Sequence, residues 1–145
     1  MSGVRGERPI GLPRYWRWAV VYYSLNAFRY VGMTITTRRW RYVDGVKTYD
    51  DERTEWSVPA TSSGFGGVVA DTYSATVNNS DGWEGLDAVL NIAHGSPITG
   101  SYRLEVFFQA STDGTTFADY NRNAALPVLA RYGSNIAGVE QLTLQ

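Results

Sequence analysis

Cationic and aromatic side chains alternate in two short stretches of the N-terminal third of this sequence. Residues 14–18 are Arg-Tyr-Trp-Arg-Trp, and residues 38–41 are Arg-Arg-Trp-Arg. Guanidinium groups stack on aromatic rings and pair with carboxylates, and Trp, Tyr and Arg are enriched at the energetic centres of protein interfaces. The chemistry that these residue types favour is therefore binding rather than the making or breaking of bonds.

Three interpretations of the two stretches remain open. Alternation could bury the tryptophans and leave the arginines between them in solvent. The stretches could instead form a protein–protein interface, or bind nucleic acid through base stacking and phosphate contacts. The tryptophans concerned are Trp16, Trp18 and Trp40. The side chains that we expect to contact a partner are Arg5, Arg8, Arg14, Tyr15, Arg17, Tyr23, Arg38, Arg39, Arg41 and Tyr42.

Charge is distributed unevenly along the chain. Residues 1–42 contain eight arginines and one glutamate, a net charge of +7, whereas residues 43–145 carry a net charge of −8. The acidic remainder would repel phosphate, so no nucleic-acid partner is expected. Opposed charges favour a surface that meets a protein partner, including a neighbouring copy of the same chain.

The sequence offers no catalytic or metal-binding constellation. His94 is the single histidine and there is no cysteine, which excludes a disulfide framework and the usual zinc site. No serine has an evident base partner. The acidic residues 50–55 (DDERTE) lack the spacing of a calcium loop and are predicted to be a solvated loop. We therefore expect a protein that is not an enzyme and holds no cofactor or metal.

Length and composition favour one domain that is neither secreted nor membrane-bound. The 145 residues are 43% hydrophobic, which is ample for a core. No apolar run approaches the roughly 18 residues of a membrane span, and the N-terminus lacks the apolar segment of a secretory signal. Neither a membrane partner nor export is expected.

Alternation of polar and apolar residues predicts an all-β fold. Strands are expected at residues 15–23 and 29–37, and Asp44–Gly45 predicts a hairpin turn because a type I′ turn needs positive φ at both central residues. Residues 86–93 and 102–110 alternate most clearly and are predicted to form an antiparallel pair. The expected fold is an antiparallel β-sandwich or jelly roll of about 7–9 strands. We expect residues 1–14 to form an extended N-terminal arm and residues 15–145 to form the single sandwich domain.

A second turn motif lies at residues 111–117, with the sequence Ser-Thr-Asp-Gly-Thr-Thr-Phe. Asp and Gly favour the turn, and Phe117 is expected to anchor the returning strand in the core. The motif is similar to hairpins of carbohydrate-binding and virion β-sandwiches, and it is one residue short of the Asp-box pattern.

Two resemblances follow from these residues. Residues 14–41 (RYWRWAVVYYSLNAFRYVGMTITTRRWR) resemble the opening strands of discoidin-like sandwiches, although the discoidin ligand loops have no counterpart here. Residues 71–120 resemble small virion structural proteins of tailed bacteriophages. They share with them the polar loop NNSDGW, the strand LDAVLNI, the strand SYRLEVFFQAS and the hairpin STDGTTF. The second resemblance implies a non-enzymatic particle component on the head surface or at the tail.

These observations give a principal expectation and one alternative. The principal expectation is a phage virion structural protein, assembled in the host cytoplasm, that binds copies of itself and other virion proteins as capsid decoration (cement) or as a neck or tail accessory. The alternative is a carbohydrate- or receptor-binding module of a tail fibre. A sugar would then be the partner, with Trp56 and Trp83 as the expected stacking residues.

Overall fold

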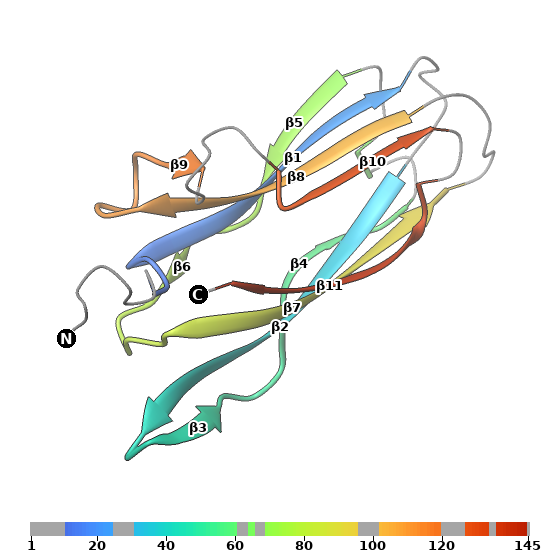
Figure 1. Ribbon diagram of the computed structural model, residues 1–145. Helices are drawn as coiled ribbons and strands as arrows, with labels where there is room; N and C mark the ends of the chain where they lie inside the picture. The colour runs from blue at the N-terminus through green and yellow to red at the C-terminus, as the bar shows by residue number, and fades with distance from the viewer. Residues whose placement is uncertain are drawn as a thin grey trace.

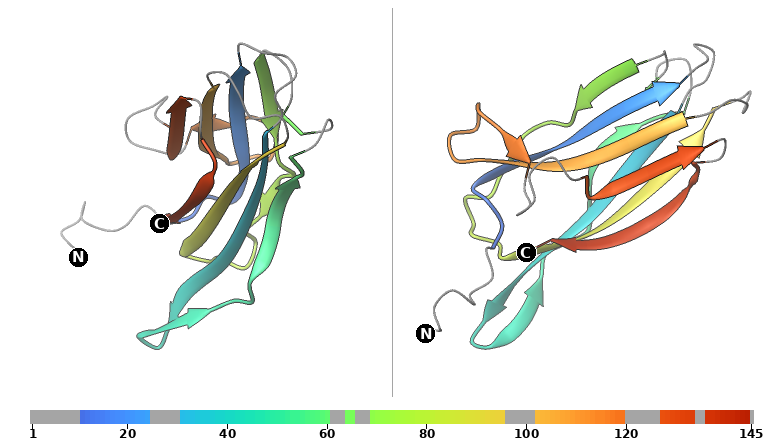
Figure 2. Two further views of the ribbon diagram at one scale, coloured as in Figure 1. Left: turned by 90° about the vertical axis from the view of Figure 1, so that its right-hand side faces the viewer. Right: turned by 45° about the horizontal axis from the view of Figure 1, so that its top comes forward.

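The computed structural model describes residues 11–24, 31–60, 64–65, 69–95, 102–119, 127–133 and 136–144. Within these ranges the protein contains eleven β-strands in two antiparallel sheets that face each other (Figures 1 and 2). Sheet A is formed by β1 (Tyr15–Ser24), β5 (Val69–Tyr73), β6 (Val77–Asn78), β8 (Tyr102–Ser111), β9 (Ala118–Asp119) and β10 (Leu129–Gly133). Sheet B is formed by β2 (Val31–Val43), β3 (Val46–Tyr49), β4 (Arg53–Val58), β7 (Gly85–His94) and β11 (Gly138–Leu144).

The predicted all-β sandwich is confirmed, with more strands than the expected 7–9. Two of the strands, β6 and β9, are short and contain only two residues each. No helix that could span a membrane occurs among the residues that the structure describes.

Of the predicted arm, residues 1–10 lie outside the described residues. Leu12 packs against the core, and the carbonyl groups of Pro13 and Arg14 accept hydrogen bonds from Asn79.

The core lies between the sheets and is built by the alternation expected from the sequence. On β1, Trp16 and Trp18 are fully buried, and both pack against Phe108 of β8 at centroid distances of 5.9 and 5.0 Å. Sheet B contributes the inward residues of β2 and β7, including Ile35 and Leu90. Burying large apolar side chains of this kind contributes about 1.5–3 kcal/mol each, so this layer dominates the stability of the fold.

The predicted pairing of residues 86–93 with residues 102–110 is wrong. Strand β7 pairs with β2 and β11 in sheet B, whereas β8 pairs with β1 and β10 in sheet A. The two strands alternate so clearly because each presents one apolar face to the core from opposite sides. A sequence pattern reports which face is buried but does not identify the strand beside it.

The interior also contains a carboxylate where the sequence predicted a solvated loop. Thr54 and Trp56 of β4 lie opposite the successive β2 residues Thr36 and Ile35, so Glu55 between them has no partner and forms a β-bulge. The bulge turns the Glu55 side chain inward, where only 2% of it is exposed. The solvated loop predicted for residues 50–55 is therefore wrong for residues 53–55, which form the start of β4.

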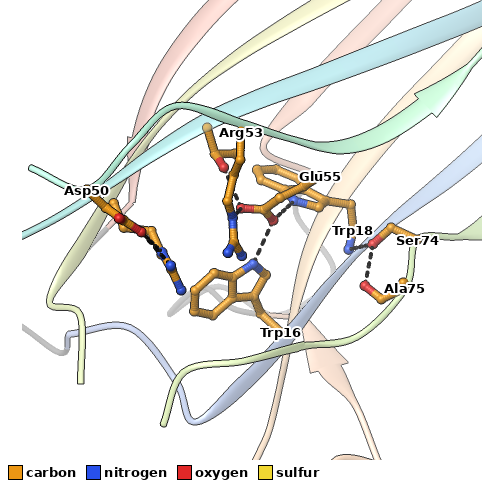
Figure 3. A network of polar contacts seen from close by, with 9 residues as sticks. Trp16, Trp18, Asp50, Arg53, Glu55, Ser74 and Ala75 are labelled. Carbon is orange, nitrogen blue, oxygen red and sulfur yellow. Dashed lines mark hydrogen bonds and ion pairs between the residues drawn. The ribbon is translucent and has the colours of Figure 1, made fainter. Parts of the chain in front are cut away.

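Glu55 connects the two sheets through hydrogen bonds (Figure 3). Its Oε1 accepts the indole N–H groups of Trp16 and Trp18, each at 2.9 Å, and its Oε2 accepts the Thr37 hydroxyl at 2.5 Å. Nε of Arg53 lies 3.7 Å from Oε2. A buried carboxylate needs such partners because an unpaired charge is very unfavourable in the interior. Strand β4 of sheet B is thus held to β1 of sheet A by polar contacts as well as by apolar packing.

The motif at residues 111–117 forms a tight turn around Asp113. Its Oδ1 accepts the backbone N–H groups of Thr116 at 2.9 Å and Thr115 at 2.8 Å, and the Ser111 hydroxyl at 2.9 Å. These hydrogen bonds hold the pKa of Asp113 well below its ordinary value of 3.8. The prediction that Phe117 anchors the core is wrong, because its ring lies 4.2 Å from the Arg17 guanidinium and outside the core cluster.

The depressed pKa of Asp113 predicts the sign of an acid effect. Because the folded pKa lies below the unfolded value, the carboxylate stabilises the fold above about pH 3.8, and this contribution is lost as the pH falls toward the folded pKa. We expect wild-type protein to lose stability relative to Asp113→Asn below about pH 4. Urea titrations of both proteins at several pH values measure this. A stability difference that does not change with pH would contradict it.

Candidate interaction surface

The β2–β3 hairpin projects beyond the rest of the sandwich (Figures 1 and 2). The pairing of β2 with β7 ends at Trp40 and Gly85, so the remainder of β2 is paired only with β3. Asp44 and Gly45 have φ values of 52° and 79°, which confirms the predicted type of turn. We call residues 42–49 the hairpin tip.

The hairpin tip carries an unusual concentration of exposed apolar side chains. Of the eight large hydrophobic residues that are exposed in the described part of the chain, four lie here: Tyr42 (54%), Val43 (45%), Val46 (64%) and Tyr49 (46%). The outer edge of β3 has no strand beside it among the described residues. Soluble monomers commonly avoid combining a free strand edge with exposed apolar side chains, because the combination invites pairing with another chain.

The arginines of β2 divide between the two faces of sheet B. Arg38 is exposed on the outer face. Arg39 and Arg41 lie on the opposite side of the strand, where both guanidinium groups stack on Trp83, at 5.3 and 4.5 Å from its ring centroid. Arg39 also forms an ion pair with Asp50, and the hydrogen bonds from Arg39 lower the pKa of Asp50. Arg39 and Arg41 therefore support the base of the hairpin.

Trp40 corrects one interpretation of the sequence. It is buried, as alternation suggested, but it lies on the outer face of sheet B rather than in the core. Its ring covers Gly85, where a Cβ atom would come within 1.9 Å of the indole, and its Nε1 donates to Asp87 at 3.2 Å. The Lys47 ammonium lies 4.3 Å from the same ring. Trp40 thus fixes the hairpin to the body of the sheet.

The predicted contact residues of the first stretch lie on or beside β1 of sheet A, so the two basic–aromatic stretches form two surfaces. Arg17 is held between the rings of Tyr73 and Phe117 at 4.0 and 4.2 Å, and its Nε donates to Gln109 at 2.9 Å. Arg14, the residue before β1, is exposed and donates to Asn78. Tyr15 and Tyr23 are half-buried on β1, and Arg5 and Arg8 lie outside the described residues.

The tryptophans expected to stack on a sugar are both engaged by protein groups. The Trp56 ring packs edge-on against Phe65 at 5.7 Å and contacts the core. Trp83 lies beneath Arg39 and Arg41. Both side chains are half-buried, and each already contacts protein groups.

The His94 side chain makes contacts that support the fold. It ends β7, its Nε2 accepts the backbone N–H of Ile136 at 3.2 Å, and its ring lies 5.0 Å from that of Tyr102. Burial lowers the pKa of His94, which favours the neutral form that this hydrogen bond requires. The histidine therefore ties the end of β7 to the segment before β11.

Comparison of the chain with protein families, with curated proteins and with solved structures gives no match. The surface described above must therefore be interpreted from its own geometry.

Proposed function

We propose that this protein is a non-enzymatic structural component of a tailed-phage virion, which binds neighbouring subunits as capsid decoration or as a neck or tail accessory. The observation that carries the proposal is the hairpin tip. It combines four exposed apolar side chains with a free strand edge at the far end of a projecting hairpin. Such a feature is favourable in an assembled particle, where a partner covers it.

The base of the hairpin supports the same role. Trp40, Arg39 and Arg41 hold β2 through stacking and ion pairing, so the tip is presented in a fixed direction. A pre-ordered element loses little conformational entropy on binding, and more of its contact energy then appears as affinity. The partners under this proposal are other virion proteins and further copies of the chain.

The tip can be tested with a double substitution that leaves the turn intact. Val43 and Val46 face each other across the turn, and full burial of a valine contributes about 1.5–3 kcal/mol. We expect Val43→Ser with Val46→Ser to weaken association with particles assembled without this chain by about a hundredfold. Co-sedimentation at several protein concentrations measures occupancy.

In a matched control, two exposed valines that lie away from the hairpin tip are replaced with serine. Val89 and Val139 are also exposed valines, and both lie on the body of sheet B. The double variant Val89→Ser with Val139→Ser is expected to retain wild-type occupancy. Equal occupancy of the tip variant and the control would contradict the proposal.

A further inference from the structure

The outer face of sheet B contains a groove that is separate from the hairpin tip. Its volume is about 560 Å³, within the usual range of small-molecule sites. The groove lies across β2, β7 and β11, where strand register places outward side chains in two rows. The first row is Thr36, Val89 and Gln141, and the second row is Arg38, Asp87 and Thr143. Glu52 completes the rim from the loop before β4.

The lining groups offer hydrogen-bond donors and acceptors at close spacing. Neighbouring side chains across antiparallel strands lie about 5 Å apart, so a hydroxyl, an amide, a carboxylate and a guanidinium converge on one short stretch of the surface. These four groups can form hydrogen bonds with a ligand that carries a hydroxyl group on almost every carbon atom. They fit an apolar ligand poorly, because these groups would lose their hydrogen bonds to water.

Asp87 is fixed in place before any ligand arrives. Its Oδ1 accepts the Trp40 indole N–H at 3.2 Å and the Thr143 hydroxyl at 3.1 Å. Both contacts use Oδ1 and restrain the Asp87 side chain, which lines the groove. A carboxylate held in this way makes charge-assisted hydrogen bonds at a low entropic cost.

The charge of the groove and its place on the sheet favour some classes of ligand over others. Arg38 carries one positive charge and Asp87 and Glu52 carry two negative charges, and the nearby Lys47 ammonium interacts with Asp87, so the groove has no excess of positive charge to attract phosphate, sulfate or carboxylate groups. The groove lies on the face of the sheet, where β2 and β7 are already paired on both sides, so a peptide strand added above them would find no ladder to extend.

We propose that this groove binds a neutral oligosaccharide, with Asp87, Gln141 and Arg38 hydrogen-bonded to its hydroxyl groups. The site goes beyond the proposed assembly role of the hairpin tip. It gives the sandwich a second surface, which binds sugar rather than protein.

The experiment begins with a printed array of neutral oligosaccharides built from glucose, galactose, mannose, rhamnose and N-acetylglucosamine, probed with the full chain. The strongest ligand on the array is then titrated into the protein by calorimetry. We expect Gln141→Ala and Asp87→Asn each to weaken binding by about tenfold. Asp87→Asn replaces the carboxylate with an amide whose oxygen can still accept from Trp40 and Thr143, so the sheet is expected to remain ordered.

The matched control is Asn91→Ala, which removes an exposed amide from the same face of β7 outside the groove. It is expected to bind within about twofold of wild type. The proposal is overturned if no oligosaccharide on the array binds the wild-type chain, or if both groove variants bind as tightly as the control. Self-association or peptide binding that Gln141→Ala abolishes, without sugar binding, would also overturn it.

Discussion

Replacing Glu55 with alanine is expected to destabilise the protein by about 3–5 kcal/mol, the usual effect of removing one partner from a buried charged contact. The substitution would leave the indole N–H groups of Trp16 and Trp18 and the Thr37 hydroxyl without their acceptor. Arg53 would lose its nearest carboxylate. Urea titration followed by tryptophan fluorescence measures this effect directly, because two of the five tryptophans donate to Glu55.

Two further variants separate the role of the carboxylate from a general effect of substitution. Glu55→Gln keeps an oxygen for the two indoles and should destabilise the fold by about 1–2 kcal/mol. Glu52→Ala removes an exposed acid only three residues away and should change stability by less than about 0.5 kcal/mol. If Glu55→Ala proves as stable as Glu52→Ala, then Glu55 does not hold the two sheets together.

Gly32→Ala is expected to destabilise the fold by about 3 kcal/mol, at the upper end of the usual range for overpacking. A Cβ atom on Gly32 would lie 2.4 Å from both the backbone nitrogen of Ala60 and the carbonyl oxygen of Val58, and 2.6 Å from the carbonyl carbon of Pro59. Backbone atoms of a packed segment cannot move aside as a side chain can. The segment after β4 would therefore have to separate from β2.

A comparison with Gly85→Ala tests this explanation. The three atoms nearest to the Cβ atom there would all belong to the Trp40 ring, and Trp40→Leu should relieve much of the collision. No such second substitution is available for Gly32, whose neighbours are main-chain atoms. Thermal or urea unfolding of these variants measures both effects. A Gly32→Ala protein within about 0.5 kcal/mol of wild type would contradict the predicted collision.

The sequence predicted those features that depend on local pattern. Alternation in residues 15–23 identified β1 and its buried tryptophans, and Asp44–Gly45 identified the hairpin turn. Both signals arise within a few residues, where strand period and the φ preference of each residue type are decisive. For the same reason the all-β sandwich could be predicted without any related protein.

The features that were missed depend on contacts between distant segments. The sequence DDERTE is typical of a solvated loop, and only the bulge in β4 turns Glu55 inward to meet Trp16 and Trp18. The groove on the outer face of sheet B needs the register of β2, β7 and β11, which no local pattern provides. Nothing in either basic–aromatic stretch indicates that β1 and β2 belong to different sheets.

The length of β2 has a mechanical consequence for the hairpin tip. The strand runs without interruption from the tip into the core, and it pairs with β7 over ten successive residues, from Val31 to Trp40. Antiparallel hydrogen bonds lie perpendicular to the strands, so a pull on the tip along β2 loads all of these bonds in shear at once. Forced unfolding depends on the barrier to rupture, and a load shared in this way raises that barrier. Tension applied at the tip would thus be borne by a pairing of ten residues rather than by the short β2–β3 pairing alone.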